Sequence, residues 1–145
     1  YSANVYLAMS AWCSFKGYDG AAAFLLKHSE EEMGHMKKLF AYVNETGAQA
    51  VVGAIEAPPR DYASLAEVMQ KTFEHEKLVT RTINDLVHSA LEGQDYSTFQ
   101  FLQWYVAEQH EEEHLFQTIL NKIEMIGTEG RGIFFIDQEI GRLAG

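Results

Sequence analysis

Four glutamates fall on the apolar faces of three predicted helices in this chain of 145 residues, and they are Glu32, Glu76, Glu108 and Glu112. A bare carboxylate buried among Leu, Ile and Met carries an effective penalty of several kcal/mol even after relaxation. Several of them in one core would also repel one another. A multivalent cation offsets both costs, and His35, three residues after Glu32, adds a nitrogen ligand. The pattern predicts a metal centre inside a helical bundle.

The elements that must position these residues are helices, because the apolar residues recur with a period near 3.6 rather than alternating. Glycines and the adjacent Pro58 and Pro59 punctuate the pattern. The predicted helices cover residues 1–16, 21–45, 64–91 and 96–127, followed by a short fifth helix over 133–143. Ser64 and Glu67 form the pattern of a capping box at the start of the third helix.

The lengths of the connections predict the topology. Short turns after the first and third helices make each pair antiparallel neighbours. The linker over residues 48–63 has roughly 16 residues and reaches about 50 Å when extended, whereas the second helix is roughly 38 Å long. The linker can therefore run the length of the bundle and leave the second and third helices parallel. We predict an all-α fold of one domain, 1–145: an up-down-down-up four-helix bundle with one long crossover and a fifth helix.

Helical phase, at about 100° per residue, indicates which polar groups point inward. Glu76 lies within about 20° of the centre of the apolar stripe on the third helix. On the fourth helix, Glu108 and Glu112 lie near the middle of the stripe and Gln109 lies on one flank. These phases predict that the third and fourth helices both present carboxylates to the core.

On the second helix, Glu32 lies on the apolar face, His35 on its edge, and Glu31 well round toward the outside. The residues that define this face are Leu25, Met36, Phe40 and Val43. Glu-x-x-His on its own is a weak signal for a metal site. Together with inward carboxylates on two other helices it is typical of a dinuclear carboxylate site.

Each of these residues also has an ordinary structural interpretation. A lone Glu on an amphipathic helix is often a boundary residue whose charge reaches water, and a lone His is more often hydrogen-bonded than a ligand. For Glu111 and Glu113 a solvated face is the default. Glu111-x-x-His114 resembles a second ligand pair, but the phase places His114 away from the stripe.

The bulk composition excludes several classes of partner. A net charge of −10 argues against nucleic acid and against an anionic membrane surface. No apolar run approaches the roughly 20 residues that span a bilayer, and no signal-peptide pattern opens the chain. The single cysteine, Cys13, suits a reducing compartment such as the cytoplasm. Tyr1 already lies inside a helical pattern without a cap, so we expect a truncated N-terminus.

Over essentially its whole length the chain resembles the bacterial non-haem ferritins. The segments that carry the match are Tyr1-Ser2, Met9-Ser10-Ala11-Trp12-Cys13, Gly20-Ala21-Ala22-Ala23-Phe24-Leu25, Glu31-Glu32-Met33-x-His35-Met36, Phe101 to Glu113, and Phe135-Ile136-Asp137. The resemblance implies a homo-oligomeric shell of twenty-four subunits that oxidises Fe(II) with O₂ or peroxide and stores Fe(III) as a mineral. The fifth helix would then line the four-fold axes of the shell.

The resemblance also implies roles for individual residues. In similar ferritins Glu32 bridges two irons, His35 binds one of them, and Glu76 and Glu112 bind the other. Gln109 lies beside the pair, Tyr6 matches a tyrosine that supplies an electron, and a third iron position would use Glu31, Glu108, Glu111 and Glu112. The family places a first-helix glutamate ligand about two residues ahead of Tyr1, and residues 1–16 contain no Asp or Glu.

Three alternatives stay open. A bacterioferritin binds haem through a methionine, and Met33 matches that position, but those proteins carry His where Glu112 stands, so we expect no haem. A DNA-protecting mini-ferritin generally lacks the fifth helix. A helical shell or interaction subunit without metal function is the third, and metal analysis separates it.

Overall fold

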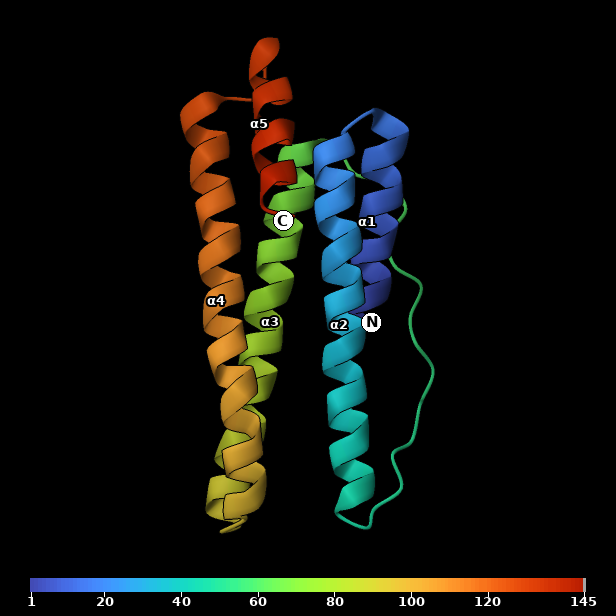
Figure 1. The fold of residues 1–145 in the computed structure, drawn as a ribbon, viewed down its shortest axis with the longest axis vertical. Coiled ribbons are helices and arrows are strands. Elements are labelled where there is room, and N and C mark those ends of the chain that lie inside the picture. Colours follow the sequence, from blue (N-terminus) through green and yellow to red (C-terminus); the bar gives the residue numbers. More distant parts are fainter. Residues whose placement is uncertain (145) are drawn as a thin grey trace. The chain divides into compact units, whose positions relative to one another are not determined.

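The computed structural model describes residues 1–144 and contains five helices and no strand in that range (Figure 1). They are α1 (Ser2–Lys16), α2 (Asp19–Glu45), α3 (Leu65–Glu92), α4 (Tyr96–Ile126) and α5 (Arg131–Arg142). Every predicted helix is confirmed, with bounds that differ by at most two residues at either end. None of the described helices combines the length and the apolar character needed to cross a membrane.

The chain divides into two compact units, each of which is described by itself. The first unit comprises Tyr1–Leu65 and the segment from Thr128 onward, so it contains α1, α2, the linker and α5. The second unit, Ala66–Gly127, contains nearly all of α3 and the whole of α4.

A tight turn joins α1 to α2 in the first unit. Gly17 ends α1 with φ 83°, a left-handed conformation that glycine adopts without steric cost. Helix α2 begins at Asp19, directly after this turn. The turn is therefore shorter than the predicted one over residues 17–20, and Gly20 lies inside the helix. Ser10 Oγ then donates to the Ala22 carbonyl and Ser29 Oγ to the Ala3 carbonyl, each at 2.7 Å. These two hydrogen bonds fix the register of the antiparallel pair.

The second half of α2 extends past the start of α1. Because Ala3 lies opposite Ser29, the later turns of α2 have no α1 residue beside them. Met36 and Phe40 are accordingly 46% and 44% exposed. These two residues of the predicted apolar face therefore lie on turns of α2 that residues 1–16 do not reach.

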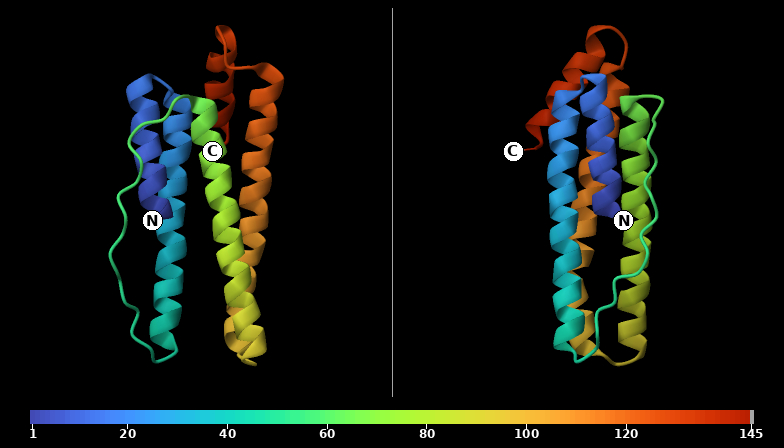
Figure 2. Two further views of the ribbon diagram at one scale, coloured as in Figure 1. Left: turned by 180° about the vertical axis from the view of Figure 1, so that it is seen from behind. Right: turned by 90° about the vertical axis from the view of Figure 1, so that its right-hand side faces the viewer.

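The linker over residues 46–64 contains no helix and runs back along α2 (Figure 2). Its far end packs beside the α1–α2 turn, where the rings of Tyr62 and Trp12 lie 5.6 Å apart in an edge-to-face arrangement. Leu65, which follows, is fully buried. The prediction that this connection runs the length of the second helix is confirmed.

Helix α5 packs on the first turn of α2. The carboxylate of Asp137 accepts hydrogen bonds from the backbone N–H of Gly20 at 3.1 Å and of Ala21 at 2.8 Å, two of the donors that the start of a helix leaves unsatisfied. A Cβ on Gly20 would lie 2.1 Å from the Asp137 carbonyl oxygen, and one on Gly141 would lie 2.8 Å from the Gly20 Cα. Glycine is therefore required at both positions for the two backbones to approach this closely.

In the second unit, α3 and α4 form an antiparallel hairpin joined by a short turn (Figures 1 and 2). Asp95 caps α4, because its side chain accepts hydrogen bonds from the backbone N–H of Thr98 at 3.0 Å and from the Thr98 hydroxyl at 2.6 Å. The buried side chains recur at helical spacing and include Val68, Met69, Thr72, Ile83, Leu102, Tyr105, Phe116 and Ile119.

Candidate metal centre

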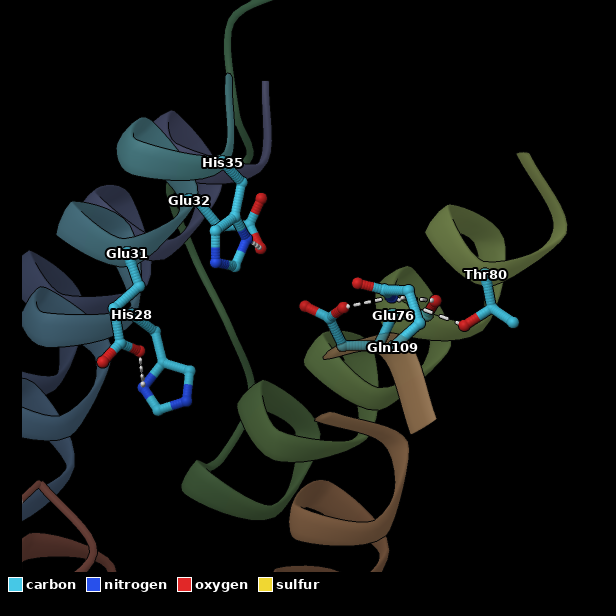
Figure 3. Close-up of polar contacts among 7 residues, drawn as sticks. All are labelled: His28, Glu31, Glu32, His35, Glu76, Thr80 and Gln109. Carbon is cyan, nitrogen blue, oxygen red and sulfur yellow. Dashed lines mark hydrogen bonds and ion pairs between the residues drawn. The ribbon is translucent and has the colours of Figure 1, made fainter. Parts of the chain in front are cut away.

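The most deeply buried acid of the chain is Glu76, on α3, with 1% of its surface exposed. Gln109, on α4 and 3% exposed, donates from Nε2 to Glu76 Oε2 at 2.9 Å (Figure 3). The same nitrogen lies 3.3 Å from the Glu76 carbonyl oxygen and 3.4 Å from Thr80 Oγ1. A hydrogen bond from an amide to a carboxylate fixes its orientation, so Gln109 holds Glu76 in one position across the hairpin.

Glu112 follows Gln109 by three residues on the same face of α4 and is 8% exposed. Glu108 is only half-buried. The prediction that Glu108 lies nearer the centre of the stripe than Gln109 is therefore wrong. The buried positions of α4 are Leu102, Tyr105, Gln109, Glu112, Phe116 and Ile119, and this phase places residue 108 at the edge.

In the first unit, α2 presents Glu32 and His35 one turn apart on the same side of the helix (Figure 3). Glu32 Oε1 lies 3.4 Å from His35 Nδ1, and the two side chains are 14% and 16% exposed. The predicted Glu-x-x-His pair therefore forms, with both groups partly shielded from water. A carboxylate oxygen beside an imidazole nitrogen is a donor set that suits iron, manganese or zinc.

A second histidine on α2, His28, was not predicted as a site residue. It is 6% exposed, its Nδ1 lies 3.0 Å from the Phe24 carbonyl oxygen, and the same nitrogen lies 4.0 Å from Glu31 Oε2. Figure 3 shows it on the turn that precedes the Glu32–His35 pair. The spacing of four residues from His28 to Glu32 and seven to His35 is the signal that would have found it.

The remaining predicted residues have varied environments. Tyr6 is fully buried on α1. Glu31 is about two-fifths exposed, in agreement with its predicted outward phase, and Glu111 is exposed. The structure therefore gathers Glu76, Gln109 and Glu112 on buried faces of the second unit, and leaves Glu111 at the surface.

Cys13 does not offer a thiolate to a metal. It is completely buried in α1, and burial, with a smaller contribution from the charge of Asp137, raises the pKa of its thiol from 9.0 to about 12. Since the thiolate is the form that binds metals, Cys13 stays a neutral packing group at ordinary pH. The candidate metal centre is one of oxygen and nitrogen ligands.

Residues 1–126 match the family described as the ferritin-like domain. The chain belongs to this family. It is 57% identical over 144 residues to the "Probable bacterial non-heme ferritin-like protein" of Haemophilus influenzae, a match that spans 99% of this chain and 87% of the relative. It is 50% identical over 143 residues to the "Bacterial non-heme ferritin" of Escherichia coli O157:H7, with coverage of 99% and 87%.

Solved structures of ferritins have the same fold as this chain. An open pore ferritin from the hyperthermophilic archaeon Archaeoglobus fulgidus superposes with a TM-score of 0.93 at 36% identity, covering 97% of this chain and 86% of that one. A Chlorobium tepidum ferritin matches with a TM-score of 0.86 at 51% identity, covering 96% and 85%. The predicted fold class is confirmed: an all-α, ferritin-like bundle with a short C-terminal helix.

Proposed function

We propose that this protein oxidises Fe(II) at a dinuclear carboxylate site and stores the Fe(III) as a mineral inside a homo-oligomeric shell of twenty-four subunits. Its membership of the ferritin-like family supports the proposal. The observation that carries it is the near-complete burial of Glu76 and Glu112. Two carboxylates on buried faces are costly for an empty core and are stabilised when a multivalent cation binds.

The ligand assignment follows the resemblance and the side chains of each unit. Glu32 bridges the two irons, and His35 binds the first. Glu76 and Glu112 bind the second, with Gln109 beside them as the group that orients Glu76. Glu31, Glu108 and Glu111, together with Glu112, form a third iron position, and Tyr6 supplies an electron during oxidation.

The reaction has a simple balance. Two Fe(II) ions held about 3.5–4 Å apart allow a small oxidant to contact both. Each ion gives up one electron, so O₂ takes two electrons and two protons to become hydrogen peroxide, and two Fe(III) ions remain. When peroxide is the oxidant, its O–O bond breaks and two water molecules form. The side chains bind and orient the ions, while the redox chemistry belongs to the iron.

We propose the domain organisation, location and partners on the same grounds. Residues 1–145 act as one di-iron domain, in the cytoplasm, with Fe(II) and O₂ or peroxide as substrates. Neither nucleic acid nor a membrane is a partner, in keeping with the net charge of −10. We expect no haem, and a Soret absorption band in the purified protein would contradict this.

Rapid mixing of Fe(II) with oxygenated protein tests the function. Glu32→Ala removes the proposed bridging ligand, and we expect it to slow the initial oxidation by about 100-fold. Glu30→Ala is the matched control, since Glu30 is an exposed acid two residues away on the same helix and should leave the rate unchanged. Equal fast rates in the parent and Glu32→Ala would exclude Glu32 from the centre.

A further inference from the structure

A cleft of about 270 Å³ lies between α3 and α4, within the unit that carries Glu76. Its polar lining comes from Thr80 and Asn84 on α3 and from Gln109, His110 and Glu113 on α4. Neither His110 nor Glu113 belongs to the set of iron ligands proposed above. The cleft is therefore a feature that the metal centre alone does not explain.

The inner end of this cleft reaches the candidate metal centre through one side chain. Gln109 lines the cleft, and its Nε2 is also the donor to Glu76 Oε2 at 2.9 Å. Thr80, another lining residue, lies 3.4 Å from the same nitrogen. A single neutral amide thus separates the cleft from the buried carboxylate. An amide carbonyl is itself an acceptable oxygen ligand for a hard cation.

The outer end of the cleft favours cations. His110 is exposed and Glu113 is half-buried, and they lie one turn apart on α4. Among the described residues that line the cleft, Glu113 is the one acid, and none is Lys or Arg. A carboxylate at the mouth attracts cations, and no Lys or Arg of the described lining opposes it.

The volume of the cleft also fits a hydrated ion. A water molecule occupies about 30 Å³ of liquid, so about 270 Å³ has room for a divalent cation together with six water molecules. Ile83 and Val106 complete the walls and limit the width. The ion can therefore enter hydrated and exchange its water ligands for protein oxygens further in.

We propose that this cleft is the entry route by which Fe(II) reaches Glu76. Glu113 and His110 capture the hydrated ion, Asn84 and Thr80 replace part of its water, and Gln109 moves aside as Glu76 binds. This inference rests on the proposed function for the identity of the ion. The route itself is a property of the cleft and applies to any small divalent cation.

Two variants test the route and leave every proposed ligand of the metal centre in place. Asn84→Trp fills the exposed mouth with a bulky ring, and Glu113→Gln removes the capturing charge while keeping the shape. The control is Glu124→Gln, an exposed acid on the same helix that lies outside this cleft. Loading is followed with Co(II), whose visible absorption reports binding without any oxidation, and in parallel with Fe(II) oxidation across a range of iron concentrations.

We expect Asn84→Trp to slow Co(II) loading by about ten-fold and Glu113→Gln by about three-fold. The number of Co(II) ions bound at equilibrium, and the oxidation rate at saturating iron, should match the parent and Glu124→Gln. Unchanged loading rates in both variants would overturn the proposal. A lower equilibrium number of ions would also overturn it, because the residues would then form the site rather than the route.

The result also separates this inference from the proposed function. Slower Co(II) loading in the variants, with no fast iron oxidation even in the parent protein, would support the route and refute the ferroxidase activity. Fast iron oxidation in the parent, with identical loading in every variant, would support the activity and refute the route.

Discussion

The two units of the chain hold their share of the candidate metal centre in different ways. In the second unit, Glu76 is almost completely buried and is fixed by a hydrogen bond from Gln109 on the neighbouring helix. In the first unit, Glu32 and His35 come from successive turns of one helix and remain partly exposed. The second unit couples its ligand to the packing between its helices, whereas the contact between Glu32 and His35 in the first unit lies within α2.

In the first unit, the long-range contacts between α5 and the start of α2 lie away from Glu32 and His35. Asp137 caps the start of α2, and the backbones of Gly20 and Gly141 touch there, whereas Glu32 lies more than a helical turn beyond. In the first unit, a substitution at a proposed ligand should therefore change metal binding with little effect on stability. In the second unit, one substitution should change both.

The largest effect is expected from Gln109→Leu. It removes the donor to a buried carboxylate, so we expect a loss of about 1–3 kcal/mol in the free energy of unfolding of the metal-free protein. Affinity for Co(II) should fall by about 10- to 100-fold, since Glu76 is no longer held in position.

His35→Ala is the comparison in the first unit. It should weaken Co(II) binding by removing a ligand, yet lower the free energy of unfolding by less than Gln109→Leu does, because its contact with Glu32 lies within one helix rather than between two. Denaturant unfolding and Co(II) titration of both variants measure the contrast. Equal losses of stability in the two would contradict it.

A pair of glycines on α2 gives the next effect. Gly20→Ala places a Cβ 2.1 Å from the Asp137 carbonyl oxygen, so α5 must shift, at a cost of about 1–3 kcal/mol. Gly34→Ala, on the same helix, meets nothing within 4 Å and should stabilise the protein by about 0.5–1 kcal/mol. Thermal unfolding separates the two, and equal shifts of both melting temperatures would argue against the close approach of α2 and α5.

At neutral pH the smallest effect is that of Cys13, whose contribution to stability changes only in alkaline solution. The pKa of its thiol is raised to about 12 in the folded protein, from an ordinary value of 9.0. Below pH 9 the thiol is protonated in both states, so its contribution to stability is fully present. As the pH rises from 9 towards 12 the unfolded chain releases a proton that the folded chain keeps, and stability falls by about 1.4 kcal/mol per pH unit.

Denaturant unfolding of the parent and of Cys13→Ala across this pH range isolates the contribution of the thiol. The parent should show the steeper decline, and parallel curves would contradict the raised pKa. Iron oxidation at neutral pH should be equal in the two proteins, since Cys13 is not a ligand.

Much of the fold could be predicted from the sequence because helices depend on local pattern. The apolar stripe of α3 is regular enough to place Glu76 at its centre, and the long linker could only belong to a crossover. The register between α1 and α2 could not be predicted in the same way. It is fixed by hydrogen bonds from Ser10 to the Ala22 carbonyl and from Ser29 to the Ala3 carbonyl, which join residues of different helices.

Details of the site could not be predicted from helical phase, because they depend on contacts between different helices. Helical phase placed Gln109 on a flank, whereas its hydrogen bond to Glu76 depends on how α3 and α4 face each other. His28 had the spacing of a site residue, but a lone histidine carries little weight without its neighbours. The cap that Asp137 provides to α2 joins residues more than a hundred positions apart, and no local pattern indicates it.

Anomalous diffraction at the iron edge, from crystals soaked anaerobically in Fe(II), would locate the bound ions and their ligands in one measurement. We predict two strong peaks, one bound by Glu32 and His35 and the other by Glu76 and Glu112, with a weaker third beside Glu31. Strong iron peaks elsewhere on the protein, with none within bonding distance of the Glu32 and Glu76 carboxylates, would contradict it.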